Sequence, residues 1–406
     1  MGGLTTAIPK TLDDWLSHQQ TLHPKNIDLG LERIQTVYRR LFPSGVAFKV
    51  VTVAGTNGKG STVGYLENIY KQSPYKVGSF TSPHLLSYNE RFKINTKPVD
   101  DTDICQAFET IETARGKTSL TYFEFSTLAA LLIFASKKVQ VAILEVGLGG
   151  RLDSVNVVEP DLSIITSIDI DHSEYLGDTR EKIALEKAGI MRTNKPCVCA
   201  DPNPPRSLID HAKKLSTKFF LINKKDFPQG VTDNPIQQQN MAMALRAVAL
   251  MHAYFPISED KALAAVQKTK LAGRQQVLRY KDKTFILDVA HNPAAVRALN
   301  QSILKSKEPT IAIFSALGDK DITNMIDAIS AQIDLWLLIP LEVERGLTKK
   351  QLTDYFDCHS NVNICKNAQM AFKTALENKN AKRIVVFGSF HTVALVSEIL
   401  NKLSKP

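Results

Sequence analysis

The sequence predicts an α/β protein with two domains: a P-loop domain built on a parallel sheet, followed by a smaller Rossmann-like α/β domain. Three observations predict this class. Apolar strand-like runs alternate with helical stretches in the first half of the chain, and the alternation restarts near residue 271. A glycine-rich turn joins the first such run to a helical stretch. The chain has 406 residues, whereas a single domain usually has ~100–200.

The first half favours a parallel sheet with helices on both faces, because strands and helices alternate along the chain. We expect strands at residues 48–54, 76–80, 139–146, 162–167 and 196–200. We expect helices at residues 61–71, 103–114, 123–136, 180–188, 240–253 and 258–268.

The second half repeats this pattern on a smaller scale. We expect strands at residues 284–289, 310–314, 335–339 and 383–387, helices between them, and a last helix at 393–403. The boundary is placed at Arg274, which gives domains of residues 1–273 and 274–406. A site that uses groups of both domains would lie in the cleft between them.

Composition points away from several classes of protein. The net charge is +9, but the basic residues are scattered, so we expect anionic small substrates and no nucleic acid. The five cysteines lack the spacing of a zinc or redox motif and are expected to be buried free thiols. The N-terminus lacks a signal core, and no segment approaches the ~20 apolar residues of a membrane span. These features predict a cytoplasmic protein without a membrane partner.

A phosphate loop is predicted at residues 50–61, VVTVAGTNGKGS. Glycines let backbone N–H groups converge on one anion, and the following helix adds its N-terminal partial charge. Lys59 offers a cation for the β and γ phosphates, and the Ser61 hydroxyl suits phosphate or magnesium. The pattern departs from the commonest P-loop because Gly60 separates these two residues. A generic glycine turn is the alternative, and a P-loop alone does not name a reaction.

Polar side chains follow three further strand-like runs. Glu145 ends the run in VQVAILEVGLGGRLD, and His172 follows the run in IITSIDIDHSE. Ser82 ends a third run. Ligands bind beyond the carboxyl ends of parallel strands, so together these residues predict a magnesium site. Taken singly, Glu145 could be a surface acid and His172 a loop histidine. Lys187, in EKIALEKAGI, reads from spacing alone as a solvated helix charge.

The second domain carries a further polar group in FILDVAHNP. Asp288 could accept hydrogen bonds from ribose hydroxyls, as acids do in other nucleotide sites. His291 could orient a carboxylate or a phosphate. Arg274, in the AGRQ stretch, could reach nucleotide phosphates from the linker.

The motifs taken together resemble the folylpolyglutamate synthases, a branch of the Mur-type amide ligases. The motifs are GTNGKGS at 55–61, SPHL at 82–85, LEVGLGGRLD at 144–153, DHSEYLG at 171–177, EKAGI at 186–190, AGRQ at 272–275, DVAHNP at 288–293 and GSFHTVA at 388–394. IDLGLERI at 27–34 and SLTYFEF at 119–125 further resemble the bacterial bifunctional dihydrofolate synthase/folylpolyglutamate synthases. The resemblance extends from about residue 12 to residue 396.

The resemblance implies a set of binding residues. ATP would be bound by Thr56, Asn57, Gly58, Lys59, Gly60, Ser61, Asn240, Arg274 and Asp288. Mg²⁺, as two ions, would be held by Ser82, Glu145, His172 and a carbamylated Lys187. The pterin substrate would be held by Asp28, Leu29, Gly30, Leu120, Thr121, Tyr122, Phe123, Arg151, Leu152 and Asp153. His291, Ser389 and His391 would lie towards glutamate and the acyl phosphate. Lys59, Lys187 and His291 would be the catalytic residues.

The resemblance also implies an activity, that of an ATP-dependent acid–amino-acid ligase. L-Glutamate would be joined to dihydropteroate, giving dihydrofolate, and to the γ-carboxyl of reduced folates, giving polyglutamates. Both reactions would pass through an acyl phosphate, and the enzyme would act as a monomer. Three alternatives share parts of the pattern: a small-molecule kinase, a Mur-type cell-wall ligase and a non-catalytic nucleotide-binding protein. Glutamate-dependent phosphate release and turnover of UDP-linked peptides would distinguish them.

Overall fold

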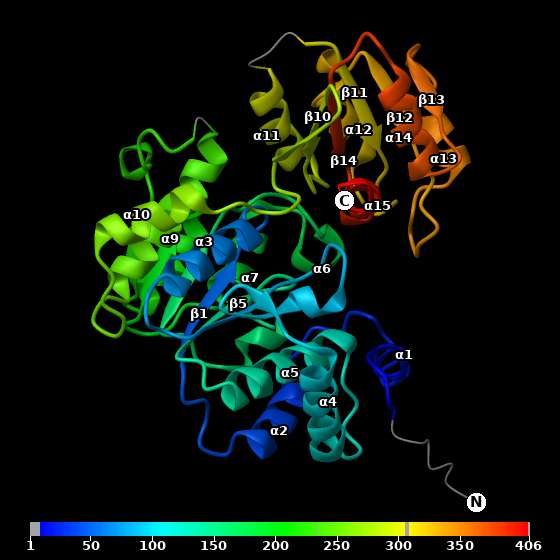
Figure 1. Ribbon diagram of the computed structural model, residues 1–406. Coiled ribbons are helices and arrows are strands. Elements are labelled where there is room, and N and C mark those ends of the chain that lie inside the picture. The colour runs from blue at the N-terminus through cyan, green and yellow to red at the C-terminus, as the bar shows by residue number, and fades with distance from the viewer. Residues whose placement is uncertain (1–8, 233, 305–307, 405–406) are drawn as a thin grey trace, which may run out of the picture. The chain divides into compact units, whose positions relative to one another are not determined.

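The computed structural model describes residues 9–232, 234–304 and 308–404 (Figure 1). The chain forms two units. The first unit comprises the chain up to His84 together with Tyr88–Thr269. The second unit comprises Leu85–Ser87 and the chain from Lys270 onward.

The first unit is built on an eight-stranded sheet with the order β4-β3-β2-β5-β1-β6-β7-β8. Strands β2, β5, β1, β6, β7 and β8 are parallel, whereas β3 and β4 run antiparallel at one edge. Every strand expected in this half is present; β3, β4 and β8 were not expected. The strands are β1 (Lys49–Ala54), β2 (Val77–Phe80), β3 (Phe92–Ile94), β4 (Lys97–Pro98), β5 (Val141–Glu145), β6 (Leu162–Ile165), β7 (Pro196–Cys199) and β8 (Lys218–Leu221).

Helices cover both faces of this sheet, with α3, α9 and α10 on one side and α2, α4 and α5 on the other (Figure 1). The helices expected from sequence are present, with bounds that differ by up to five residues; α1, α2, α6 and α8 were not expected. The helices are α1 (Leu12–Thr21), α2 (Glu32–Leu41), α3 (Lys59–Lys71), α4 (Asp101–Arg115), α5 (Tyr122–Ser136), α6 (Ser173–Leu176), α7 (Arg180–Ala188), α8 (Arg206–Lys214), α9 (Pro235–Leu250) and α10 (Glu259–Lys268). Single 3₁₀ turns occur at Tyr88–Arg91, Ser154–Val157 and Lys224–Asp226.

The central strands of the first unit are mostly apolar and almost wholly buried, because both faces of the sheet are covered. In β1, Val50 and Ala54 face the core under α5, and the alternate residues Val51 and Val53 are equally buried on the other face. Helix α5 is apolar all round, as a helix inside a domain should be. The carboxyl ends of β1, β2, β5 and β6 therefore meet at one edge of a rigid sheet, and the predicted ligands follow these ends.

The second unit holds a six-stranded sheet with the order β13-β12-β11-β14-β10-β9, in which only β9 runs antiparallel to its neighbour. Helices α14 and α15 bury one face, and α11, α12 and α13 bury the other. The expected strands are present. The elements are β9 (Gln276–Tyr280), β10 (Lys283–Leu287), α11 (Pro293–Ile303), β11 (Thr310–Phe314), α12 (Ile322–Asp327), a 3₁₀ turn at Ser330–Gln332, β12 (Leu335–Leu338), α13 (Lys349–Tyr355), β13 (Val362–Ile364), α14 (Ala368–Glu377), β14 (Arg383–Phe387) and α15 (Phe390–Leu403).

Two composition-based expectations can be compared with the structure. The five cysteines carry free thiols, and Cys197, Cys199 and Cys365 are buried as expected, whereas Cys105 is only partly buried and Cys358 is exposed. No helix in the described part of the chain has the length and apolar character needed to cross a membrane.

Candidate active site

The predicted phosphate loop joins β1 to α3. Gly55 and Gly58 have φ angles of +149° and +89°, which side-chain-bearing residues rarely adopt. Lys59, Gly60 and Ser61 open α3, and Ser61 is buried. Lys59 Nζ donates hydrogen bonds to the carbonyl oxygens of Gly55 at 2.9 Å and Thr56 at 3.3 Å, so the lysine folds back over the loop.

The segment after β6 holds this loop in place. Thr56 N donates to Ser167 O at 2.8 Å, and Asn57 N donates to Ser167 Oγ at 3.0 Å. Thr166 Oγ1 donates to Asn57 O at 2.6 Å. Thr56 Oγ1 bonds to the backbone of Asp169. Sequence reasoning missed Thr166 and Ser167; the only signal was their place at the end of a predicted strand.

Asn240 lies against the phosphate loop. A Cβ added at Gly58 would approach Asn240 Oδ1 to 2.6 Å. The Asn240 side chain is buried, and its Nδ2 has no hydrogen-bond partner among the described residues. Helix α9 thus presents a buried amide donor at the loop; the resemblance assigns this residue to the nucleotide.

Two of the predicted metal ligands meet at neighbouring strand ends. Glu145 is the last residue of β5 and is buried, so its reading as a surface acid is wrong. Ser82, two residues after β2, donates its backbone N–H to Glu145 Oε2 at 3.2 Å. His172 precedes α6 in the left-handed conformation, with φ of 51°. Its backbone N–H donates to Asp171 Oδ1 at 2.9 Å.

Lys187 is buried, with 3% of its surface exposed, so its reading as a solvated helix charge is also wrong. Burial, and then the neighbouring Lys59 cation, lower the pKa of Lys187 to about 7, against the opposing effect of Asp171 and Asp153. Burial likewise raises the pKa of Asp153 to about 6, opposed by hydrogen bonds from backbone N–H groups and by Lys59. Four charged groups beside the phosphate loop therefore influence one another: Lys59, Lys187, Asp153 and Asp171.

The segments predicted to hold the pterin converge in the first unit. Gly30 N donates to Leu152 O at 3.2 Å, which joins the 28–30 segment to the 151–153 segment. Phe123 stacks on Phe80, with ring centroids 5.6 Å apart, and lies against Gly147. Leu120 is fully buried, Thr121 caps α5, and Tyr122 and Leu29 are partly buried.

The remaining members of this set have clear local partners. Arg151 pairs with Glu186 through Nη2 at 2.8 Å. Asp153 accepts backbone N–H bonds from Leu148 at 2.8 Å and Val155 at 3.0 Å. Asp28 binds Arg33, a residue that sequence reasoning did not single out although it lies in the IDLGLERI motif.

The candidate residues of the second unit gather around two points. Asp288 accepts N–H bonds from Gln275 at 3.2 Å and Ala290 at 2.8 Å. Burial raises the pKa of Asp288 to about 6, opposed by the Arg274 cation. The Arg274 guanidinium lies over the Phe390 ring, 5.1 Å from its centroid. The centroids of the His291 and Phe390 rings are 6.0 Å apart.

The orientation of these residues limits their roles. His291 Nδ1 lies 2.9 Å from Val289 O and must donate to it, so in the neutral ring Nε2 carries the lone pair. Ser389 Oγ accepts a hydrogen bond from Thr392 N and so caps the N-terminus of α15, which is a structural role. His391 is exposed on the first turn of α15.

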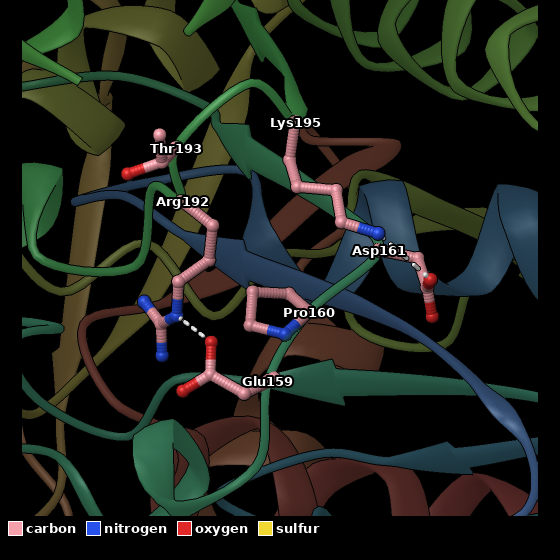
Figure 2. A pocket seen from close by; sticks show the side chains of 6 residues that line it. All are labelled: Glu159, Pro160, Asp161, Arg192, Thr193 and Lys195. Atoms are coloured by element: carbon pink, nitrogen blue, oxygen red, sulfur yellow. Dashed lines mark hydrogen bonds and ion pairs between the residues drawn. The ribbon is translucent and has the colours of Figure 1, made fainter. Parts of the chain in front are cut away.

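A pocket of about 450 Å³ lies away from these residues. Figure 2 shows its lining, which follows the amino ends of β6 and β7. Its charged groups neutralise one another: Arg192 pairs with Glu159, and Asp161 pairs with Lys195 at 3.4 Å and with Lys49 at 3.1 Å. The phosphate loop lies at the opposite, carboxyl end of the strands, so this pocket is separate from the candidate active site.

Metal binding needs a donor set that the residues can supply. Among the described residues, no three His, Cys, Asp or Glu side chains cluster as a metal site. The predicted set contains only two such residues, Glu145 and His172. It therefore also needs the Ser82 hydroxyl and the anionic carbamate of Lys187 as ligands. The buried Lys187, coupled to Lys59 and two aspartates, fits such a form.

Comparisons with known proteins identify both parts of the chain. The Mur ligase middle domain matches residues 53–278, and the Mur ligase glutamate ligase domain matches residues 273–390. The dihydrofolate synthase/folylpolyglutamate synthase of Escherichia coli is 38% identical over 98% of this chain and 97% of its own. That of Haemophilus influenzae is 37% identical, over 97% and 98%.

Solved structures agree along the whole chain. Escherichia coli FolC in complex with DHPP and ADP has a TM-score of 0.89 and 35% identity, with 98% of this chain and 99% of that chain covered. The bifunctional synthase of Yersinia pestis complexed with AMPPNP and Mn ion has a TM-score of 0.88 and 37% identity, with 97% and 99% covered. The chain therefore belongs to the dihydrofolate synthase/folylpolyglutamate synthase family of Mur-type, ATP-dependent glutamate ligases.

Proposed function

We propose that this chain joins L-glutamate to dihydropteroate, giving dihydrofolate, and to the γ-carboxyl of reduced folates, giving polyglutamates. ATP is the co-substrate of both reactions, and magnesium, as two ions, is the cofactor. The names of the relatives include both activities. Related structures are described with DHPP and ADP, and with Mn, AMPPNP and L-glutamate.

One observation carries the proposal: buried Lys187 is coupled to Lys59 of the phosphate loop. Burial and a neighbouring cation both disfavour the charged form of Lys187, so its surroundings suit a chemistry that removes this charge. A neutral Lys187 amine can attack carbon dioxide, forming a C–N bond and releasing one proton to water. The product is a carbamate with a single negative charge, and Lys59 then faces an anion.

The carbamate of Lys187 would complete a ligand set with Ser82, Glu145 and His172. Oxygen-rich sets of this kind suit magnesium. Magnesium, when bound, supplies positive charge that stabilises the phosphoryl oxygens of ATP. The chain's own donors are the backbone N–H groups of Gly58–Ser61, the Lys59 ammonium and the buried Asn240 amide, all beside the same loop. In the second unit, Arg274 and Asp288 would contact the nucleotide.

The reaction follows from these groups. A substrate carboxylate oxygen attacks the γ-phosphorus, the bond to ADP breaks, and an acyl phosphate forms. Lys59, released from Gly55 O and Thr56 O, neutralises charge on the transferred phosphoryl group. The amine of glutamate then attacks the acyl carbon and phosphate leaves. With Nδ1 donating to Val289 O, Nε2 of the neutral His291 ring is an acceptor, and we assign it to accept a proton or to orient glutamate. Ser389 and His391 are assigned to the same side.

The pterin would be held where three segments meet: residues 28–30, 120–123 and 151–153. The backbone bond from Gly30 to Leu152 and the Phe123–Phe80 stack support this assignment. An aromatic wall with a buried carboxylate, Asp153, beside it suits a flat heterocycle with polar edges.

The decisive experiment measures ATP turnover by the purified chain. Phosphate release is followed with glutamate plus dihydropteroate, and then with glutamate plus tetrahydrofolate. Release that needs both glutamate and the pterin substrate, with an amide product seen by mass spectrometry, supports the proposal. Lys59→Met, prepared in parallel, controls for contaminating ATPases. Phosphorylation of the pterin substrate without glutamate would instead indicate a kinase, and the proposal would fail.

Further properties are part of the same proposal. We assign the domains to residues 1–273 and 274–406. The enzyme would act as a monomer in the cytoplasm without nucleic acid; its free cysteine thiols suit a reducing compartment. Light scattering coupled to gel filtration tests the monomer directly.

A further inference from the structure

Arg33 on α2 connects the segments to which the proposed function assigns the pterin. Its Nη1 donates to Asp28 Oδ2 at 2.6 Å, and its Nη2 donates to the Asp28 carbonyl oxygen at 2.6 Å. Its Nε lies 3.4 Å from both carboxylate oxygens of Glu124. One guanidinium therefore fixes the side chain and the backbone of Asp28 against helix α5.

Glu124 in turn fixes the start of α5. It forms a capping box with Thr121, in which Thr121 N donates to Glu124 Oε2 at 2.7 Å. The Glu124 side chain is only 4% exposed, and Arg33 is its one cationic partner among the ion pairs of the described residues. The turn that carries Thr121, Tyr122 and Phe123 is thus tied to the 28–30 segment through Glu124 and Arg33.

His23 makes a second connection between the same segments. Its Nε2 lies 3.2 Å from Asp28 Oδ2, and its Nδ1 lies 3.2 Å from Ser119 Oγ. A carboxylate only accepts, so Nε2 carries the hydrogen in the neutral ring and Nδ1 accepts from the Ser119 hydroxyl. The imidazole therefore bridges Asp28 to the residue before Leu120. We call Arg33, His23, Asp28, Glu124 and Ser119 the Asp28 clasp.

We propose that Arg33 and His23 are positioning residues whose loss impairs the dihydropteroate reaction more than polyglutamylation. This inference rests on the proposed function, because it takes the clasped segments as the pterin site. Neither residue needs to touch the substrate. They act by holding Asp28 and the start of α5, the two segments assigned to the pterin, at a fixed distance from each other.

The selectivity follows from the stiffness of the two substrates. In dihydropteroate the reacting carboxylate is joined to the pterin through a rigid benzoate. Only the short methylene–amino link between pterin and benzoate can rotate, so most of a displacement of the pterin reaches the distance between the carboxylate and the γ-phosphate, which must fall to ~3–3.5 Å. In a folate substrate, rotatable glutamate bonds separate the pterin from the reacting γ-carboxyl. These bonds can absorb a displacement of an ångström at a modest entropic cost.

The test compares both reactions in a small set of variants. Arg33→Met removes the guanidinium and keeps the length of the side chain. His23→Leu removes both ring contacts, and His23→Gln keeps one donor and one acceptor. Arg40→Met is the matched control: Arg40 also lies on α2 and ties it to α4, by donating to Ala114 O at 2.8 Å and Arg115 O at 3.0 Å, without touching the clasp. Steady-state kcat and KM are measured for dihydropteroate and for tetrahydrofolate, alongside Tm.

We expect Arg33→Met to lower kcat/KM for dihydropteroate by roughly tenfold or more, because charge-assisted hydrogen bonds are lost. The corresponding loss for tetrahydrofolate should stay below about threefold on the same scale. His23→Leu should show the same bias more weakly, and His23→Gln should recover wild-type ratios. Arg40→Met should lower both reactions equally or not at all, whatever its effect on Tm.

Equal losses of the two reactions in folded Arg33→Met and His23→Leu would overturn the inference, as would a bias of the same size in Arg40→Met. A bias towards loss of polyglutamylation would also overturn it. Failure of the proposed function would look different: the wild-type chain itself would not turn over dihydropteroate with glutamate.

Discussion

Asn240 places a buried amide against Gly58 in the phosphate loop. Its Oδ1 would lie 2.6 Å from a Cβ at Gly58, and its Nδ2 has no hydrogen-bond partner among the described residues. A buried donor without a partner costs ~1–3 kcal/mol. Helix α9 therefore carries a group that is unfavourable in the free protein and available to a nucleotide oxygen.

Asn240→Ala should weaken nucleotide binding, because it removes the donor proposed for a nucleotide oxygen. It should leave Tm unchanged or higher, because that donor is unsatisfied in the free protein. We expect roughly a tenfold loss of ADP affinity, equivalent to ~1.4 kcal/mol, measured by titration calorimetry. Asn300→Ala is the control, since Asn300 Nδ2 donates to Ala328 O at 2.8 Å in the second unit. That variant should lose stability and keep its ADP affinity. A lower Tm with normal ADP affinity in Asn240→Ala would contradict the assignment.

Lys187 should be carbamylated in the active enzyme. Lys187→Ala should lose turnover by several factors of ten, each equivalent to ~1.4 kcal/mol of barrier, because a ligand and a charge disappear together. A short carboxylate in the medium should restore part of the rate by occupying the vacated space. Incubation with ¹³C-labelled bicarbonate should give a carbamate signal in the wild type that is absent from Lys187→Ala. Lys182→Ala, an exposed lysine on the same helix paired with Asp178 at 2.8 Å, should keep both the signal and the rate.

Local sequence patterns predicted the parts of the fold that local physics determines. The β1–loop–α3 unit was predictable because glycines, a lysine and an apolar strand are contiguous. The β3–β4 hairpin was missed because strands of three and two residues carry no readable alternation. Helix α8 was missed although its apolar face is regular, since it is short and lies in a polar stretch.

The candidate site likewise has residues that local sequence predicts and residues that only tertiary packing reveals. Glu145 and His172 could be proposed from their places at strand ends, but burial decides whether Glu145 or Lys187 acts as a surface charge. Burial depends on what packs above them, which spacing does not encode. The Arg33–Glu124 contact joins residues 91 positions apart and depends on how α2 packs against α5. Single-sequence reasoning has no access to such pairs.

Asp288 should make the second unit less stable as the pH rises. Its folded pKa of about 6 lies above its ordinary value of 3.8, so the folded form holds the proton more tightly than the unfolded form. Its stabilising effect is complete below about pH 4 and is lost as the pH rises to about 6. The total is at most about 3 kcal/mol, at ~1.4 kcal/mol per pKa unit.

Asp288→Asn should therefore gain stability relative to the wild type between pH 4 and pH 7, measured by calorimetry at several pH values. The lost acceptor for Gln275 N or Ala290 N adds an offset that does not change with pH, so the slope is the informative quantity. Asp282→Asn is the control, because that side chain is exposed and follows β9 in the same unit. It should show no such slope. A parallel stability profile for wild type and Asp288→Asn would contradict the prediction.

One catalytic centre should perform both glutamate additions. The chain contains a single GTNGKGS loop, and Glu145 lies at the end of the strand beside it. Glu145→Gln removes a buried carboxylate from the proposed ligand set and should abolish both reactions. Phe123→Leu removes a ring that stacks on Phe80 at 5.6 Å and lies against Gly147, so the pterin wall loosens.

Because the rigid dihydropteroate transmits a pterin displacement to its carboxylate, Phe123→Leu should impair dihydrofolate synthesis more than polyglutamylation. We expect a bias of roughly tenfold in kcat/KM, carried mainly by KM. Phe42→Leu is the matched control, since Phe42 also packs against an aromatic ring, that of Tyr38, with the ring centroids 5.3 Å apart, at the far end of α2. Both rates are measured on the same preparations, with ADP binding as a check on the phosphate loop. If Glu145→Gln removed one activity and left the other at full rate, two centres would be required, and the chain offers only one phosphate loop to build them.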